Sequence, residues 1–200
     1  MFTLSTGAPQ GCALSANLFV LYTNDLKSDC DKTSIIKYAD DTVVVGFITN
    51  QDDSEYFNCI SKVERWCDTN YLCLNVRKTK EMHWDFRKEP SHKTPVKLGN
   101  MNVEVVQSYK YLGLYIDSGL SYADHVKITR KKVNKRLYFL RSMVRLKVDP
   151  AIIALFFNAT IPPVLNYSSL AFYRLIPQYL RSEMDRPRRI CQRLIGKASI

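Results

Sequence analysis

The chain has 200 residues, of which 46% are hydrophobic, and its 29 Lys and Arg outnumber its 19 Asp and Glu to give a formal net charge of +10. The hydrophobic content excludes a disordered tail, and only 7 Gly and 8 Pro without a repeating period exclude collagen-like, low-complexity and solenoid folds. One or two globular domains are expected.

The first predicted element is a helix that follows a turn-rich loop. The loop is Gly-Ala-Pro-Gln-Gly at residues 7–11. After it, apolar side chains recur with the spacing of one helical face from Leu14 to Leu26. The pattern predicts a loop that leads into a helix.

Two strands with an acidic turn come next. The β-branched runs at residues 35–38 and 42–48 flank Ala39-Asp40-Asp41. β-Branched side chains fit a pleated, buried surface, whereas adjacent aspartates suit a turn. We therefore expect two buried strands joined at a tip that carries two carboxylates.

A second helix and four short strands are predicted between residues 52 and 116. Asp52 or Asp53 suits the N-cap of a helix that ends near Asn70. Strand composition, interrupted by Lys/Thr, Pro and Gly/Asn breakers, then recurs in four segments: residues 72–76, 81–86, 103–106 and 110–116.

The hydrophobic period becomes helical in the last part of the chain. Residues 125–147 form an amphipathic basic pattern, and Asp149-Pro150 is a typical N-cap and first-position pair of another helix. The predicted fold class is α+β, with an antiparallel sheet and covering helices over residues 1–120 and an all-helical basic region over residues 121–200.

One segment has the length and composition of a membrane span. Residues 150–173 carry no charge over 24 residues, which is enough to cross a bilayer. Pro162-Pro163 interrupts the segment, and four polar side chains would need partners in lipid: Asn158, Asn166, Ser168 and Ser169. We expect two buried helices of a soluble domain and no membrane contact.

The cysteines predict a reducing compartment. The six cysteines form no Cys-x-x-Cys pair, and a polar stretch rather than a signal peptide follows Met1. We expect free thiols in a cytoplasmic or nuclear protein.

The excess positive charge lies entirely at the C-terminal end. Residues 1–129 hold 14 basic and 16 acidic side chains, whereas residues 130–200 hold 15 basic and 3 acidic. A segment with this charge attracts polyanions and accelerates encounter with them. Nucleic acid is the partner that we expect from this charge, and an anionic membrane surface is only the second interpretation of it.

Asp40 and Asp41 are the candidate metal ligands. Two carboxylates beside buried strands suffer repulsion and desolvation, and a divalent cation relieves both. Mg²⁺ prefers oxygen ligands and is commonly held by one or two carboxylates together with substrate phosphates, which suits nucleotidyl transfer. On the dipeptide alone, a solvated Asp-Asp turn is the alternative.

Four motifs in chain order resemble those of reverse transcriptases from non-LTR (LINE-type) retrotransposons. In that family the motifs are the template and nucleotide contact loop, the catalytic tetrapeptide, a lysine-bearing motif and the primer grip. The matching segments are Ser-Thr-Gly-Ala-Pro-Gln-Gly-Cys at 5–12, Tyr-Ala-Asp-Asp at 38–41, Asn-Val-Arg-Lys-Thr-Lys-Glu at 75–81 and Tyr-Lys-Tyr-Leu-Gly at 109–113.

The resemblance implies a role for each matching residue. Asp40 would be the principal ligand and Asp41 a weaker ligand of a two-metal Mg²⁺ site, with Tyr38 packed beneath it. Lys78 or Lys80 would neutralise the pyrophosphate, unless each is a solvated surface lysine. The implied template and substrate contacts are Gly7, Pro9, Gln10, Gly11, Tyr38, Lys78 and Lys80, and the implied primer grip is Tyr111, Leu112 and Gly113.

The chain departs from the family in one respect that concerns the chemistry. Reverse transcriptases take a further metal-binding Asp from a strand before the contact loop and hold the incoming nucleotide with the fingers, whereas only six residues precede Gly7 here. The resemblance therefore implies a fragment that lacks the fingers and the first catalytic Asp. The expected function is therefore a fragment of an RNA-directed DNA polymerase with an incomplete Mg²⁺ site, inactive alone. Its implied partners are an RNA template, a DNA primer and the missing N-terminal part of the polymerase.

The basic helical region would correspond to the polymerase thumb. A solvated helix face that aids solubility is the alternative interpretation. Candidate contacts to a phosphate backbone are Arg130, Lys131, Lys132, Lys135 and Arg136, and a second cluster is Arg186, Arg188, Arg189 and Arg193.

Two other functions compete with the polymerase fragment. One is a retroelement remnant that binds nucleic acid without catalysis. The other is an AlkB-type tRNA-modifying dioxygenase or methyltransferase-associated module. Residues 125–196 of this chain resemble a segment of the N-terminal module of such an enzyme. In that case His83-Trp84-Asp85 with His92 or His125 would ligate iron, although a glycine-rich methyl-donor loop is absent.

Overall fold

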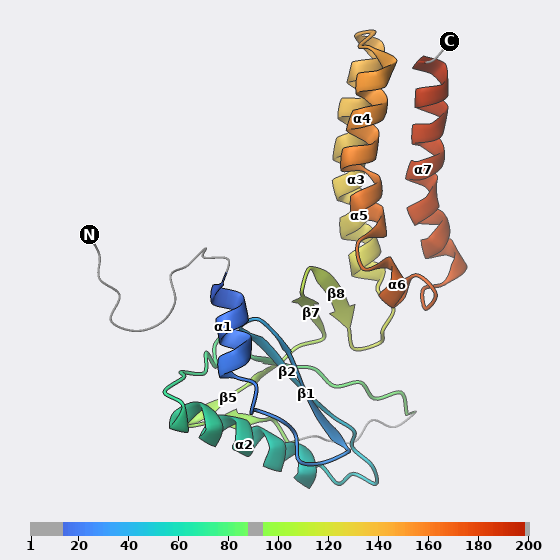
Figure 1. Ribbon diagram of the computed structural model, residues 1–200. Helices are drawn as coiled ribbons and strands as arrows, with labels where there is room; N and C mark the ends of the chain where they lie inside the picture. The colour runs from blue at the N-terminus through green and yellow to red at the C-terminus, as the bar shows by residue number, and fades with distance from the viewer. Residues whose placement is uncertain (1–13, 88–93, 199–200) are drawn as a thin grey trace, which may run out of the picture. The chain divides into compact units, whose positions relative to one another are not determined.

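The computed structural model describes residues 14–87 and 94–198, which are mixed helix and small two-stranded sheets (Figure 1). The predicted α+β class is confirmed. The chain divides into two compact units, a first within residues 1–79 and 91–104 and a second within residues 80–90 and 105–200. Each unit has its own hydrophobic core.

The first unit contains the predicted hairpin. Strand β1 (Thr33–Tyr38) pairs antiparallel with β2 (Asp41–Gly46) through the two-residue loop Ala39-Asp40. The expectation of wholly buried strands is wrong, because only alternate residues are covered: Ile35 packs into the core, whereas Ile36 is 52% exposed. The sheet is therefore half-buried, with one face on the core.

Helix α2 (Ser54–Thr69) covers that face and confirms the second predicted helix. The Asp52 carboxylate accepts a hydrogen bond from the Ser54 backbone N–H at 3.1 Å, which satisfies a donor of the first turn. Apolar side chains every three or four residues explain the packing against the sheet. The buried ones are Cys59, Ile60, Val63 and Cys67.

Helix α1 (Ser15–Tyr22) is shorter than predicted. It ends at Tyr22 because the chain turns at Thr23, and Leu26 then enters the core beside Val63 and Cys67. None of the α1 side chains is buried.

The short strands differ most from prediction. Residues 72–76 form no strand, and β3 (Lys80–Glu81) and β6 (Glu104–Val105) cover only parts of two predicted segments. A hairpin of β4 (Lys97–Leu98) and β5 (Met101–Asn102) was not predicted. Gly99, at φ +56°, makes its turn and was the available signal.

The second unit begins with another hairpin. Residues 110–116 were predicted as one strand, but β7 (Ser108–Tyr111) and β8 (Leu114–Asp117) pair antiparallel across Leu112-Gly113. Both loop residues have positive φ, +45° and +85°, as a tight two-residue hairpin turn requires.

The helices of the second unit confirm the all-helical C-terminal prediction. Helix α3 matches the predicted basic helix, and the Asp149 side chain caps α4 by accepting from the Ala151 N–H at 2.7 Å. The helices are α3 (Ala123–Arg145), α4 (Pro150–Thr160), α5 (Pro162–Asn166), α6 (Ser169–Phe172) and α7 (Gln178–Ala198).

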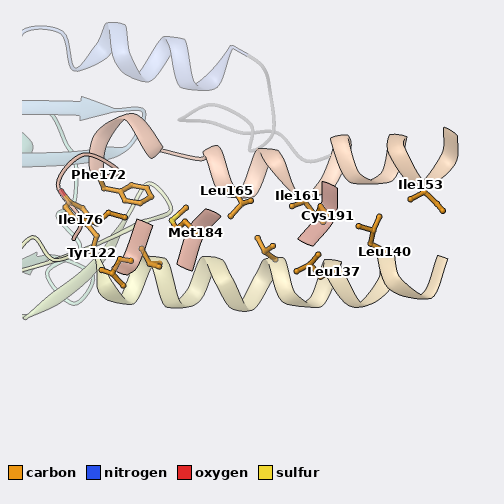
Figure 2. Close-up of a cluster of buried hydrophobic side chains, with 13 residues drawn as sticks. Tyr122, Leu137, Leu140, Ile153, Ile161, Leu165, Phe172, Ile176, Met184 and Cys191 are labelled. Atoms are coloured by element: carbon orange, nitrogen blue, oxygen red, sulfur yellow. The ribbon is translucent and has the colours of Figure 1, made fainter. Parts of the chain in front are cut away.

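Apolar side chains from all five helices or their ends meet in one core (Figure 2). At one end of this core, the Phe172 ring lies against Tyr122 and His125, with ring centroids 5.7 and 4.7 Å away. Leu140 and Ile153 lie at the other end. Helix α3 thus packs against α4, α5 and α7 along its length.

The uncharged segment is divided into α4, α5 and α6 rather than two helices. Its residues 150–172 are long and apolar enough, by length and composition alone, to cross a membrane. Ile153 and Leu165 are buried in the core, whereas Leu155 and Leu170 are 69% and 101% exposed. The prediction of buried helices therefore holds for one face only.

Candidate nucleic-acid and metal site

Asp40 and Asp41 lie at the tip of the β1–β2 hairpin, as predicted. Tyr38 pairs with Asp41, so Ala39 and Asp40 form the loop, and Ala39 has a left-handed φ of +49°. Both carboxylates are exposed. Neither makes a hydrogen bond or ion pair with any residue that the structure describes. The two side chains are thus available to an external cation.

The donor chemistry of this pair fits Mg²⁺, because carboxylate oxygens are the ligands that the ion prefers. The pair does not complete a site. Among residues 14–87 and 94–198, no group of three or more His, Cys, Asp or Glu side chains is arranged to hold a metal. Water, phosphate or a carboxylate from elsewhere would have to supply the remaining ligands.

The side chain beneath the tip is Lys37, which the sequence analysis missed. Alternation along β1 places Lys37 on the covered face, and its ammonium group donates to the carbonyl oxygens of Thr23 and Leu26, the latter at 3.1 Å. Tyr38 points to the other face and is 63% exposed, so its predicted packing beneath the site is wrong. The signal for Lys37 was a lone lysine within a β-branched run.

The lysine-bearing motif forms a turn rather than a strand. The Asn75 side chain accepts from the Lys78 N–H at 3.2 Å, and the Asn75 carbonyl accepts from the Thr79 N–H at 3.0 Å. Lys78 is exposed in the first unit, and Lys80 is partly buried in β3 of the second unit. The exposure of Lys78 agrees with a solvated lysine.

Of the expected template and substrate contacts, four lie outside the described residues: Gly7, Pro9, Gln10 and Gly11.

The expected primer-grip residues form the β7–β8 turn. Tyr111 ends β7, and Leu112-Gly113 make the loop. The Tyr167 hydroxyl donates to the Leu112 carbonyl oxygen, and a Cβ on Gly113 would lie 3.1 Å from the Tyr167 ring. Tyr167, from the end of α5, therefore fixes the turn from outside the hairpin. Sequence reasoning missed it because no local pattern indicates a contact at this separation.

The base of the same hairpin is held by Asp117. Burial acts to raise the pKa of this carboxyl, but hydrogen bonds outweigh it and hold the pKa below its ordinary value. The donors are the backbone N–H groups of Gly119, Ser121 and Tyr122 and the Ser121 hydroxyl. Asp117 thus organises the loop that leads into α3.

His125 joins the hairpin to the helices. It is 4% exposed, and its Nδ1 accepts a hydrogen bond from the Tyr115 N–H at 3.4 Å. Burial, together with the positive charge of Lys132, lowers the pKa of His125. The ring is therefore neutral at pH 7.

The other residues of the iron-site alternative have partners of their own. His83 Nε2 lies 2.9 Å from the Glu81 carboxylate, and Asp85 accepts two hydrogen bonds from Arg87 at 2.8 and 2.7 Å. His92 lies outside the described residues. The described part of the chain thus does not bring His83, Asp85 and His125 together as ligands.

The basic residues of α3 serve two purposes. Arg130 pairs with Glu183 of α7 at 2.8 Å, and Arg136, partly buried, donates to the Thr160 carbonyl at the end of α4. These two cations stabilise the helix packing, which differs from the predicted phosphate contacts. Of the five predicted phosphate contacts, three remain exposed and make no hydrogen bond or ion pair with a described residue: Lys131, Lys132 and Lys135.

Comparison with known proteins supports the motif assignment. Residues 2–116 match the family described as Reverse transcriptase (RNA-dependent DNA polymerase). Over 153 residues the chain is 24% identical to the probable RNA-directed DNA polymerase from transposon BS of Drosophila melanogaster, an alignment that covers 72% of this chain and 17% of that protein. The chain thus spans less than a fifth of the length of this curated relative. No solved structure matches.

Proposed function

The chain belongs to the reverse transcriptase family, and from this we propose that it is a fragment of the RNA-directed DNA polymerase of a LINE-type retrotransposon. The observation that carries the proposal is the pair Asp40 and Asp41, adjacent at a hairpin tip, exposed and without a competing partner in the described part of the chain. A nucleotidyl-transfer enzyme needs acidic side chains in this arrangement.

Asp40 and Asp41 would hold Mg²⁺. When bound, the ions activate the primer 3′-hydroxyl and neutralise the leaving pyrophosphate. Lys37 keeps the hairpin on the loop that follows α1, so that the two carboxylates are held on a supported strand pair. The loop of residues 7–11 and the exposed Tyr38 would contact template and incoming nucleotide, and Lys78 or Lys80 would meet the phosphates.

The second unit would hold the nucleic acid. Leu112-Gly113, fixed by Tyr167, would support the primer strand, and the exposed lysines of α3 would bind its phosphate backbone. The template is RNA and the primer DNA. In this scheme residues 1–120 are a partial palm and residues 121–200 a thumb-like region.

The fragment is expected to be inactive alone, because two carboxylates do not complete a two-metal site. The test is primer extension on an RNA template after supplying the upstream palm and fingers of the parent polymerase, either fused to this chain or added to it. Extension is expected, and Asp40→Ala should abolish it.

The matched control is Asp31→Ala, which removes another exposed aspartate of the first unit and should leave extension unchanged. Extension that survives Asp40→Ala, or a complete failure of the supplemented protein to extend any primer, would contradict the polymerase assignment.

A non-catalytic nucleic-acid-binding remnant is the second candidate. The incomplete metal site favours this candidate, since the described residues bring only Asp40 and Asp41 together at the hairpin tip. The charge favours it too, because residues 130–200 hold 12 more basic than acidic side chains. This candidate predicts equal affinity of the wild type and the Asp40→Ala/Asp41→Ala variant for a primer–template hybrid, with or without Mg²⁺.

A further inference from the structure

Helix α7 carries three arginines on one outward face. Arg186, Arg189 and Arg193 follow one another by three and four residues, so they lie on one stripe about 10 Å long. All three are exposed, and none makes a hydrogen bond or ion pair with a described residue. On the opposite face of α7, Met184 and Cys191 are buried in the core.

The acidic residues of α7 leave this stripe unneutralised. Glu183 pairs with Arg130 of α3 at 2.8 Å. Asp185 accepts a hydrogen bond from the Tyr173 hydroxyl at 2.9 Å and lies 3.8 Å from Arg188. Three like charges within two helical turns repel each other, and an anion bound across them would relieve that repulsion.

The composition of the face favours a phosphate backbone over a lipid surface. A helix that lies on a membrane needs large apolar side chains to enter the acyl boundary. The exposed residues of this face contain no aliphatic side chain and a single aromatic one, Tyr179: they are Gln178, Tyr179, Ser182, Arg186, Arg189, Gln192, Arg193 and Gly196. Guanidinium groups bind phosphate oxygens through two parallel hydrogen bonds, which suits successive phosphates of a strand.

We propose that the Arg186-Arg189-Arg193 stripe of α7 is a second nucleic-acid-binding surface, separate from the lysines of α3. Each helix turns its buried face into the one core of the second unit, so the two exposed faces look away from that core in different directions. The unit can therefore contact two segments of backbone at once. The surface does not depend on Asp40 or Asp41, and its test is independent of polymerase activity.

The test is the salt dependence of binding, measured with the full chain and a labelled 20-nucleotide single-stranded RNA or a DNA duplex of the same length. The variant is R186Q/R189Q/R193Q. Each lost phosphate contact should lower the slope of log affinity against log salt by about 0.7 on a single strand and about 0.9 on a duplex. The expected loss is therefore about 2 on RNA and nearly 3 on the duplex.

Three comparisons make the result decisive. R186K/R189K/R193K keeps the charge and should keep the slope, whereas loss of slope there would mean that the helix has been disturbed and would overturn the proposal. A charge-matched variant of exposed cations of the first unit, K27Q/R65Q/K97Q, should leave the slope unchanged. K131Q/K132Q/K135Q on α3 should lower the slope independently, so that the two triple variants add.

Two outcomes overturn the proposal directly. One is a salt slope that is unchanged in R186Q/R189Q/R193Q, or that changes equally in the charge-matched variant. Either result would show that the three arginines act only through the net charge of the chain and form no binding surface. The other is binding of the wild type to vesicles containing 30% anionic lipid that the variant loses while its RNA affinity stays the same.

Discussion

The Tyr167 hydroxyl donates a hydrogen bond to the carbonyl oxygen of Leu112, a residue 55 positions earlier in the chain. Leu112 has a φ of +45°, a conformation that costs an ordinary L-residue about 1–2 kcal/mol. The contact therefore fixes a strained turn, and that turn has the position of the primer grip in the proposed polymerase.

We predict that Tyr167→Phe destabilises the second unit by about 1 kcal/mol, because it removes one hydrogen bond and leaves the Leu112 carbonyl without it. The measurement is the urea dependence of unfolding, with hydrogen exchange at the Gly113 amide as a local readout. Tyr138→Phe is the control, since its hydroxyl has no partner among the described residues. Equal exchange at Gly113 in both variants would show that the contact is not formed.

Gly113→Ala should cost more than about 1 kcal/mol, because φ is +85° and the new methyl group would lie 3.1 Å from the Tyr167 ring. Adding Tyr167→Ala removes the steric contribution to the cost of Gly113→Ala and leaves the contribution of the backbone conformation. The two substitutions should therefore be less destabilising together than the sum of their separate effects on the free energy of unfolding. Strict additivity would argue against the packing of Tyr167 on the turn.

Asp117→Asn should destabilise the second unit by about 1 kcal/mol at pH 7, because the ionised carboxylate accepts four hydrogen bonds. The folded-state pKa is lowered, so this stabilisation is present above the ordinary pKa of about 3.9 and is lost as pH falls below it. Unfolding measured from pH 3 to 7 should show the variant and wild type converging in acid. A constant difference across that range would contradict the assignment, and Asp31→Asn serves as the control.

Protonation of His125 should weaken the second unit. Its folded-state pKa is lowered, so the unfolded chain takes up the proton first, and stability falls as pH drops below the ordinary value of about 6.5. In His125→Gln the free energy of unfolding should change less between pH 7.5 and 5. The idea fails if His125→Gln keeps the full pH dependence of the wild type.

Arg136 and Lys131 should have opposite phenotypes although both were predicted to bind phosphate. Arg136→Gln should lower the free energy of unfolding by about 1 kcal/mol, since it removes the donor to the Thr160 carbonyl, and should leave the salt dependence of RNA binding intact. Lys131→Gln should leave stability within about 0.5 kcal/mol and weaken RNA binding. A weaker salt dependence of RNA binding in Arg136→Gln would show that Arg136 contacts the nucleic acid.

Local patterns were enough to predict the main elements. The β-branched runs around Ala39-Asp40-Asp41 gave the hairpin, and the pair Asp149-Pro150 located the start of α4. Helix α3 was predicted closely because its apolar period extends over six turns, which leaves little ambiguity. The five described cysteines are free, as expected.

The errors arose where tertiary contacts override composition. Leu112 sits among strand-forming residues and rarely adopts positive φ, so only Gly113 indicated the turn that divides β7 from β8. Residues 72–76 have strand composition but no pairing strand. Prediction of the site was limited in the same way. The position of Asp40 and Asp41 at an exposed tip follows from local sequence, whereas Lys37 supports the hairpin through contacts with a loop more than ten residues away in the chain.

Metal binding by Asp40 and Asp41 is best tested by Mn²⁺ titration of the ¹⁵N-labelled chain, because Mn²⁺ replaces Mg²⁺ and broadens nearby amide signals. We expect broadening confined to residues 38–42, at about millimolar Mn²⁺ for so incomplete a site, and its loss in Asp40→Asn/Asp41→Asn. The adjacent pair Asp52-Asp53, with the Asp52 carboxylate bonded to Ser54, is the internal reference. Broadening that is equal at both pairs, or that survives the double substitution, would contradict the metal-binding role of this hairpin.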